Sequence, residues 1–218
     1  MTTGLTIIIA DDHPLFRGAL KQALLGSGDE TAIVEAGDFD AARASASQCP
    51  DADLMLLDLS MPGASGLSGL ITLRAEHPGL PVIVVSARDD AATIRRALDL
   101  GASGFISKSA SIEEIREGIA AVLDGNIHTP GGYQRGPEQD AEIGDLISRL
   151  RTLTPQQSRV LSMLAEGLLN KQIAYELGVS EATIKAHVSA ILLKLNVDSR
   201  TQAVIQLGKI GATSAAAA

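Results

Sequence analysis

Polar side chains that could carry acid–base or cation-binding chemistry follow short apolar runs in the first half of the chain. Leu54–Leu57 holds four apolar residues without alternation, which is typical of a strand buried on both faces of a parallel sheet, and Asp58 follows it directly. Open α/β sheets place their reaction sites at the carboxyl ends of such strands. A single Asp before the Pro62–Gly63 turn is also typical of an Asx turn, so the other strand ends decide its role.

Three further apolar runs also end in, or are followed by, polar residues that could take part in such chemistry. These residues are Asp11 and Asp12, Ser86, and Lys108. Each has an ordinary alternative, because an acidic pair can cap a helix, a serine can be a loop hydroxyl and a lysine can be a solvated side chain. Their occurrence at four separate strand ends favours a common site. If the first and third strands are neighbours, three carboxylates converge there, and a divalent cation would relieve their repulsion.

That arrangement predicts phosphoryl chemistry. Mg²⁺ is held by carboxylates, waters and phosphate oxygens, and Asp11, Asp12, Asp58 and Ser60 are the candidate metal-site residues. With the cation present, Asp58 can act as a nucleophile and form an aspartyl phosphate. Ser86 can donate to a phosphate oxygen, and Lys108 can neutralise its charge.

The elements that must position these residues alternate along residues 1–125. Five short β-type runs are predicted: Leu5–Ala10, Ala32–Glu35, Leu54–Asp58, Pro81–Ser86 and Gly104–Ser107. Five helical patterns separate or follow them: Pro14–Leu25, Asp38–Cys49, Leu67–His77, Asp90–Leu100 and Ser111–Leu123. This alternation predicts an α/β fold, a doubly wound five-stranded parallel sheet in the order 2-1-3-4-5.

Length and composition restrict the class of protein. A chain of 218 residues is long enough for two modest domains. No apolar run approaches the roughly 20 residues that a membrane span requires, and the N-terminal stretch lacks the features of a signal peptide, so we expect a cytoplasmic protein with no membrane partner. The single cysteine, Cys49, excludes an internal disulfide framework and a cysteine-rich zinc site.

Charge is distributed unevenly along the chain. Residues 1–125 carry 9 Lys and Arg against 18 Asp and Glu, whereas residues 153–218 carry 6 against 4. An acidic first part and a weakly basic last part fit a cation-binding domain joined to a reader of nucleic acid.

The connector, residues 126–152, contains two different patterns. Gly125–Pro137 is dense in Gly and Pro, which predicts a flexible linker in which His128 and Tyr133 are incidental surface residues. Beyond it, a short amphipathic helix is predicted from apolar residues at helical spacing: Ile143, Leu146, Ile147, Leu150 and Leu153. Its apolar stripe needs a partner, either one of the domains or the same helix of a second chain.

The last part predicts a helix-turn-helix. Thr154 and Gln157 form a capping box that starts a helix from Pro155 to Glu166. Asn170 is the predicted cap of a second helix over Lys171–Leu177, and Ser180 caps a longer one to Leu195. In a helix-turn-helix, the later helix of the pair, here the longer one that follows Ser180, enters the major groove of DNA. A fourth helix is expected from Ser199 to Lys209, before a low-complexity tail.

Residues 5–125 resemble the receiver domain of two-component response regulators, in the stretches IIIADDHPLFR, LMLLDLSMPG, VIVVSARDD and GASGFISK. The resemblance implies that Asp58 accepts phosphate from a sensor histidine kinase, that Asp11 and Asp12 bind Mg²⁺, and that Ser86 and Lys108 hold the phosphoryl group. It also implies that Phe105, by position otherwise a core residue, is the switch aromatic that moves with Ser86.

Residues from Leu153 to Val204 resemble the LuxR-type helix-turn-helix, including the runs NKQIA, TIKAH and KLNVDSR. The resemblance directs one set of side chains toward bases: Thr183, Lys185, Ala186 and Ser189. It directs a second set toward phosphates: Asn170, Lys171, His187 and Lys194. Leu193 departs from the pattern, since it points away from the predicted apolar stripe where relatives often have a cation.

Together these stretches identify the chain as a NarL/FixJ-type response regulator and transcription factor. The predicted domains are a receiver (1–125), a linker with a short helix (126–152), a small all-α DNA-binding domain (153–211) and a disordered tail (212–218). We expect no enzyme, promoter DNA and a sensor kinase as partners, a homodimer in the active state, and RNA polymerase as a further contact. Two alternatives stay open: an aspartyl-phosphate phosphatase on the same fold, and a transcription regulator that senses a small ligand. Ser60 stands where the phosphatase would need a second acid, and few aromatic residues are available for a ligand pocket.

Overall fold

The computed structural model describes residues 4–25, 31–64, 66–133 and 141–212. The strands of the described chain are β1 (Thr6–Ala10), β2 (Ala32–Ala36), β3 (Leu54–Asp58), β4 (Val82–Ser86) and β5 (Gly104–Ser107). Its first helices are α1 (Pro14–Leu25), α2 (Phe39–Gln48), α3 (Ser68–Glu76), α4 (Ala91–Asp99) and α5 (Ile112–Leu123). The remaining helices are α6 (Ala141–Leu150), α7 (Pro155–Ala165), α8 (Asn170–Glu176), α9 (Glu181–Leu195) and α10 (Arg200–Ala212).

The strands form one parallel sheet in the order β2-β1-β3-β4-β5, which confirms the predicted topology. β1 and β3 are neighbours, with Ala10 opposite Leu57, so the residues that follow them meet at one edge of the sheet. The chain order reverses between these two strands, and in open α/β sheets that switch point is where a crevice forms. The sheet therefore brings the acidic residues after β1 beside the one that ends β3.

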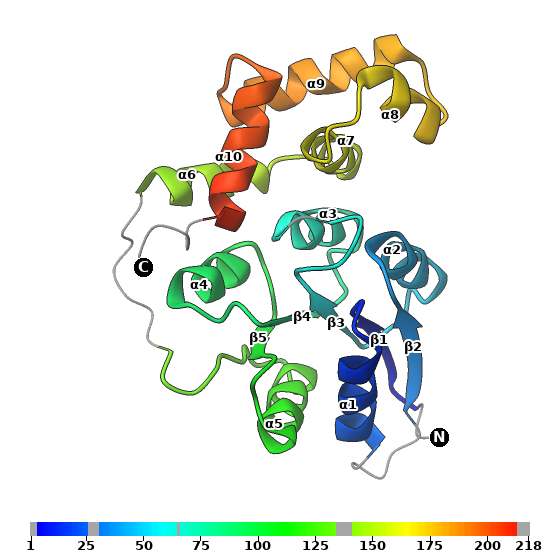
Figure 1. Cartoon of the computed structure of the whole chain (residues 1–218), viewed down its shortest axis with the longest axis vertical. Helices are drawn as coiled ribbons and strands as arrows, with labels where there is room; N and C mark the ends of the chain where they lie inside the picture. The colour runs from blue at the N-terminus through cyan, green and yellow to red at the C-terminus, as the bar shows by residue number, and fades with distance from the viewer. Residues whose placement is uncertain (1–3, 26–30, 65, 134–140, 213–218) are drawn as a thin grey trace.

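Two helical layers cover the sheet (Figure 1). On one face, α1 and α5 pack against alternate strand residues of a buried cluster that includes Ile7, Ile9, Leu56, Ile83 and Val85. On the other face, α2, α3 and α4 pack against the intervening strand residues, which include Ile8, Met55, Leu57, Val84 and Phe105. Because both faces are covered, the central strands β1, β3 and β4 are buried along nearly their whole length and carry apolar runs, as the unalternated pattern predicted, whereas the edge strand β2 includes the exposed Glu35.

The C-terminal helices form the predicted helix-turn-helix, with one correction. The capping box of Thr154 and Gln157 starts α7, and Ser180 caps α9, as predicted. The cap of α8 is Leu169 instead of Asn170, which lies inside the helix. Leu169 lacks a capping side chain, and its amide instead bonds the side chain of Gln172, so the single-residue cap prediction was wrong.

α6 supplies the answer to which surface covers the apolar stripe of the connector. Its residues Leu146, Ile147 and Leu150 are buried, and the helix packs against α9 and α10. The guanidinium of Arg149 donates to the carbonyl of Leu195 at the end of α9, at 3.0 Å. The stripe is thus covered by the C-terminal helices of the same chain.

The linker differs from the prediction where it leaves α5. His128 pairs with Gly104 as an isolated parallel bridge, and the hydroxyl of Tyr133 is buried, so neither is an incidental surface residue. Residues 134–137 of the predicted linker and 213–218 of the predicted tail lie outside the described residues. Among the described residues, no helix combines the length and apolarity that crossing a membrane requires.

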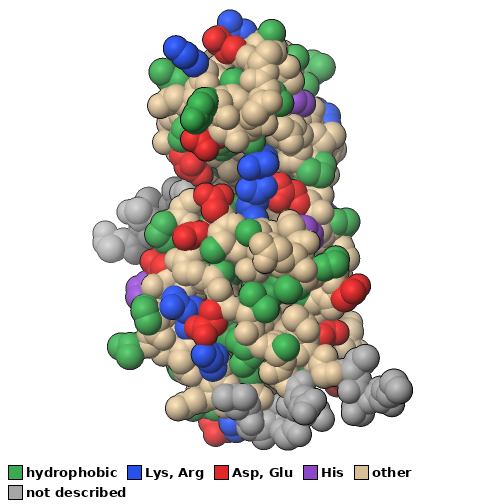
Figure 2. Space-filling view, turned by 90° about the vertical axis from the view of Figure 1, so that its right-hand side faces the viewer, with side chains coloured by type: hydrophobic (Ala, Val, Ile, Leu, Met, Phe, Trp, Pro, Cys, Tyr) green, Lys and Arg blue, Asp and Glu red, His purple; other side chains and the backbone are tan. Residues whose placement is uncertain are grey.

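The two halves of the molecule meet through α3, α4, α7 and α10 (Figure 1). Thr72 and Ser162 share a hydrogen bond of 3.1 Å between α3 and α7. The buried guanidinium of Arg96 on α4 donates to the carbonyl of Ile210 in α10, at 3.0 Å. A cleft of about 640 Å³ lies between α2 and α7, and Figure 2 shows charged side chains of both signs gathered along this side of the junction.

Candidate functional site

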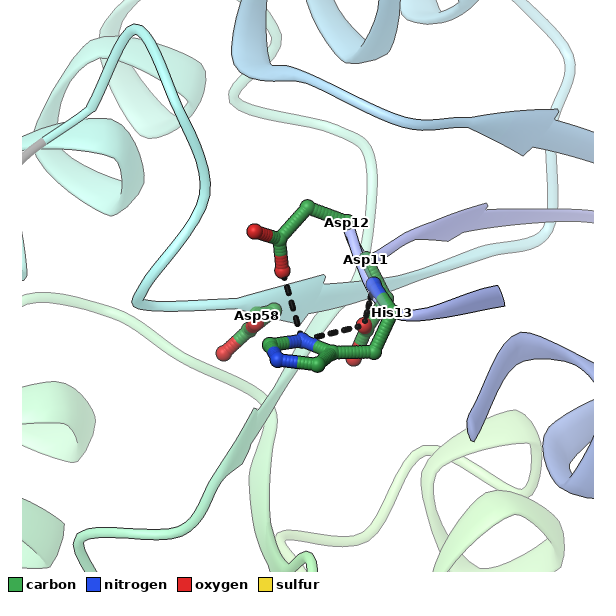
Figure 3. Close-up of side chains that lie close together, drawn as sticks. All are labelled: Asp11, Asp12, His13 and Asp58. Atoms are coloured by element: carbon green, nitrogen blue, oxygen red, sulfur yellow. Dashed lines mark hydrogen bonds and ion pairs between the residues drawn. The ribbon is translucent and has the colours of Figure 1, made fainter. Parts of the chain in front are cut away.

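An acidic cluster lies at the carboxyl ends of β1 and β3. Asp11 and Asp12 follow β1 and Asp58 ends β3; with His13 they offer ligand atoms within 4.8 Å of one another (Figure 3). Asp11 and Asp58 are only 1% and 2% exposed, so water cannot screen their charges effectively. The predicted convergence of three carboxylates is therefore present in the structure.

Lys108 is the cation of this cluster. Its Nζ lies 2.8 Å from Asp58 Oδ2 and 2.7 Å from Asp11 Oδ2, and its ammonium stands 5.0 Å from the centre of the Phe16 ring. Burial on its own lowers the pKa of Lys108, but hydrogen bonds and charge from Asp11 and Asp58 outweigh it, so the pKa is raised above the usual 10.5. The lysine is therefore charged at neutral pH.

The loops after β3 and β4 orient the other polar groups. The amide of Ser60 donates to Asp58 Oδ1 at 3.1 Å, and the amide of Arg88 donates to Ser86 Oγ at 3.0 Å. Ser86 is 1% exposed and ends β4, which is the neighbour of β3. In both loops, the side-chain oxygen at the strand end is thus oriented by the backbone amide of the residue two positions later.

The oxygen donors fit a hard divalent cation. Asp11 Oδ2 and Asp12 Oδ1 are buried; Lys108 Nζ lies 2.7 Å from the first and His13 Nδ1 lies 2.7 Å from the second. The site thus places three carboxylates around one lysine ammonium, and each carboxylate oxygen keeps a second lone pair for a further cation. Carboxylate oxygens of this kind are the ligands that Mg²⁺ takes in proteins.

Phe105 lies on β5, three residues before Lys108. Its side chain is fully buried, on the sheet face that α2, α3 and α4 cover. Its amide donates to the carbonyl of His128 at 3.0 Å. The structure therefore places the predicted switch aromatic inside the core, with its backbone bonded to the connector.

The predicted base-reading side chains lie on one outward region of α9. Thr183, Lys185, Ala186 and Ser189 are exposed, while Ile184 and Ile191 are buried against the domain. α7 contacts both α9 and α3, so α9 lies on the outer side of the C-terminal half (Figure 1). Ser180 caps the helix by accepting the Thr183 amide, and Lys185 forms an ion pair of 3.0 Å with Glu181.

The predicted phosphate contacts differ in their surroundings. Lys171 is exposed, whereas Asn170 and His187 are half-buried. Lys194 donates to the carbonyl of Thr152 at 2.7 Å and to Gln157 Oε1 at 2.8 Å, so a phosphate would compete with these internal bonds. Leu193 is 83% exposed, which confirms that it points away from the apolar stripe.

Two neighbours of the acidic cluster were not predicted from the sequence. His13 Nδ1 lies 2.7 Å from Asp12 Oδ1, and Phe16 faces the Lys108 ammonium. Both residues follow Asp12 within about one helical turn, so the sequence placed them near the site. They were missed because the prediction sought carboxylate ligands for the cation and a hydroxyl or an ammonium for the phosphoryl group.

Comparison with known families assigns both halves. Residues 7–120 match the response regulator receiver domain, and residues 151–207 match the LuxR family of bacterial regulatory proteins. The glycerol metabolism activator of Pseudomonas putida is 42% identical over 95% of this chain and 97% of its own length. The nitrate/nitrite response regulator protein NarP of Escherichia coli is 38% identical over 93% of this chain and 94% of its own.

Solved structures give the same assignment. RcsB from Salmonella enterica serovar Typhimurium, bound to promoter P1flhDC with the phosphomimetic BeF₃⁻, is 28% identical, with a TM-score of 0.56 over 95% of this chain and 100% of that one. RcsB dimers bound to two parallel DNAs give a TM-score of 0.53 at 27% identity, over 94% and 98% of the two chains. The chain belongs to the response regulators that join a receiver domain to a LuxR-family DNA-binding domain.

Proposed function

We propose that this response regulator is switched by phosphorylation of Asp58, and that the phosphorylated state controls promoter binding by α9. The observation that carries the proposal is the environment of Asp58. It is a buried carboxylate bonded to Lys108 and surrounded by Asp11 and Asp12, at the crevice of a parallel sheet.

The residues of the chain account for the transfer step. A carboxylate oxygen of Asp58 attacks the phosphorus of a phosphohistidine on a sensor kinase, and the phosphorus–nitrogen bond breaks as the imidazole leaves and takes up a proton. Lys108 stays charged and pairs with the added phosphoryl charge. Ser86 donates its hydroxyl to a phosphoryl oxygen once the group is attached.

Mg²⁺ is the proposed cofactor, with Asp11, Asp12 and Asp58 as its carboxylate residues and Ser60 at the edge of the site. When bound, it neutralises the charge that gathers on the phosphoryl oxygens. Without a cation, the same three carboxylates would repel an incoming phosphoryl donor.

The output is the DNA-binding half. We propose that Thr183, Lys185, Ala186 and Ser189 face base edges, because they share the exposed region of α9. A second set faces phosphates: Asn170, Lys171, His187 and Lys194. Engaging Lys194 would require it to leave Thr152 and Gln157.

The proposed partners follow from these two activities. They are a sensor histidine kinase and promoter DNA in the cytoplasm, with a second copy of the chain in the active state and RNA polymerase as a further contact. RcsB is a dimer on DNA in the structure compared above, which supports the proposed dimer. The phosphatase and ligand-sensor alternatives have no observation that favours them over this assignment.

The test uses the full chain with Mg²⁺ and acetyl phosphate, followed by mass spectrometric mapping of the phosphorylated residue. We expect one phosphoryl group on Asp58, none on Asp58→Asn, and none when Mg²⁺ is chelated. Asp53→Asn is the matched control, because Asp53 precedes β3 at the end of the strand away from the crevice, and its side chain accepts the Thr6 amide. A label on another residue would contradict the proposal.

Promoter binding is tested with duplexes selected from a random DNA library by the full chain in the presence of beryllofluoride and Mg²⁺. We expect tighter binding with beryllofluoride than without it, and no such difference for Asp58→Asn. Equal affinity in both conditions for the wild-type chain would refute phosphorylation control while leaving DNA binding intact.

A further inference from the structure

The segment after α5 contains a histidine that the candidate phosphorylation site does not use. The chain leaves α5 and runs past β5 (Figure 1), where His128 pairs with Gly104. The amide of His128 donates to the carbonyl of Ser103 at 3.2 Å, and its carbonyl accepts the amide of Phe105 at 3.0 Å. These bonds form an isolated parallel bridge at the free edge of the sheet, with His128 opposite Gly104.

Two glycines make room for this bridged segment. A Cβ at Gly118, on α5, would lie 2.8 Å from His128 Cδ2 and 2.9 Å from its Nε2, so the imidazole lies directly on the bare helix backbone. A Cβ at Gly104 would lie 3.2 Å from His128 Cβ. Neither glycine has a positive φ, so close approach of neighbouring groups is what the structure requires of them. Ile106 Cδ1 would lie 3.1 Å from a Cβ at Gly118, and Val122 Cγ2 would lie 3.2 Å from a Cβ at Gly104, but His128 is the neighbour that the two glycines share. Gly104 and Gly118 therefore form a cradle around His128.

The position of the bridged segment connects it to the candidate phosphorylation site. It bonds the backbone of Phe105, and Lys108, which follows the end of β5, contacts Asp58 through its Nζ. Its other end continues into the connector that leads to α6 and the DNA-binding half. A displacement of β5 at its carboxyl end would thus reach the connector through hydrogen bonds in which α4 takes no part.

We propose that residues 127–129 form a strap, held by His128 in the Gly104–Gly118 cradle, which couples the state of β5 to the DNA-binding half. The attachment of the strap stands on the geometry alone. The coupling rests on the proposed function, because it requires that phosphorylation of Asp58 alters β5. Losing the strap leaves both domains folded but frees the connector from Phe105.

The chain offers a matched set of variants. Gly118→Ala places a methyl group against the imidazole, and His128→Ala empties the cradle. Gly18→Ala is the control, since Gly18 is also helical but a Cβ there has nothing within 4 Å, so helix propensity rises equally without a clash. In the double variant, Gly118→Ala with His128→Ala, the clash with the ring is absent, and only the contact of the new Cβ with Ile106 Cδ1, at 3.1 Å, remains.

The first measurement is residue-resolved amide hydrogen exchange of the full chain without phosphoryl donor. We expect exchange at Phe105 to accelerate about tenfold in Gly118→Ala and His128→Ala, because its acceptor leaves. The amides of Ser103 and Lys108, which donate to Val82 and Ser86 of β4, should stay protected, as should all three in Gly18→Ala. Adding Gly118→Ala to His128→Ala should change nothing further. Unchanged exchange at Phe105 in both single variants would overturn the strap.

The second measurement is the ratio of DNA affinities with and without beryllofluoride and Mg²⁺, on the duplex selected above. We expect Gly118→Ala and His128→Ala to bring this ratio toward one, and Gly18→Ala to keep the wild-type ratio. A wild-type ratio in the strap variants, with faster exchange at Phe105, would overturn the coupling. A wild-type chain without any response would refute the proposed function and the coupling together, whereas the exchange data would still decide whether the strap exists.

Discussion

Replacing Lys108 with Met would test how the acidic cluster is held together. Methionine keeps an unbranched apolar stem of similar length but removes the ammonium that contacts Asp58 and Asp11. Two nearly inaccessible carboxylates would then face each other without their cation. We expect the full chain to be destabilised at neutral pH in the absence of divalent metal.

The size of this loss follows from the geometry. At the observed separations of 2.7 and 2.8 Å, each ion pair is worth about 6 kcal/mol with an effective dielectric constant of about 20. Desolvation of the three groups offsets much of that attraction, and removal of one partner from a buried ion pair typically costs about 3–5 kcal/mol. The Lys108 side chain is 15% exposed, so we expect a loss near the lower end, about 3 kcal/mol.

The assay is urea unfolding of the full chain with chelator, and its control is Lys21→Met. Lys21 pairs with Glu35 at 2.6 Å, but both side chains are more than a third exposed, so its loss should cost only about 0.5 kcal/mol. Mg²⁺ should stabilise Lys108→Met more than the wild-type chain, because it replaces the missing positive charge. The pKa of Lys108 is raised, so its contribution is complete at neutral pH and should disappear only as the pH rises beyond 10.5.

Two outcomes would refute this reasoning. Equal losses for Lys108→Met and Lys21→Met would mean that burial does not strengthen the interaction at the acidic cluster. An equal gain from Mg²⁺ in the wild-type chain and in Lys108→Met would mean that the metal and the ammonium do not act on the same carboxylates.

Three further predictions concern other parts of the chain. Thr154→Ala removes the hydroxyl that starts α7 and should cost about 1 kcal/mol in urea unfolding, with no change in Mg²⁺ binding. Burial lowers the pKa of His128 despite the charges of Glu117 and Glu114, so stability should fall as the pH drops below 6.5, and this dependence should be weaker in His128→Asn, as urea titrations at several pH values would reveal. Lys185→Ala should weaken binding to a selected duplex by about 1–3 kcal/mol and relax selection at one base pair, measured by titration of single-base variants of the duplex.

The central site was predictable because strand ends in a parallel sheet share one edge. Unalternated apolar runs identified the buried strands, and the polar residue at the end of each run could then be placed at the carboxyl edge of the sheet. Asp58, Asp11 and Lys108 meet as that reasoning requires, although they are distant in sequence. The metal roles and the phosphorylation of Asp58 remain predictions.

The contacts of the connector were not predictable in the same way. A Gly- and Pro-rich stretch indicates weak local preferences, and the pairing of His128 with β5 depends on the absence of side chains at Gly104 and Gly118. No local pattern links these positions. Likewise, a cap preference favoured Asn170, but the helix begins one residue earlier because the Gln172 side chain satisfies the Leu169 amide.

The buried cluster on the α2–α4 face of the sheet does not stop at the end of the receiver. It runs without interruption from strand residues such as Leu57 through α3 to Val160, Ile184 and Leu207 of the C-terminal helices. Two regions that share a continuous apolar interior stabilise each other, because unfolding one exposes apolar surface of the other to water. The DNA reader of this chain should therefore melt together with its receiver, in one cooperative transition, and a receiver weakened by mutation would carry the reader with it at lower temperature.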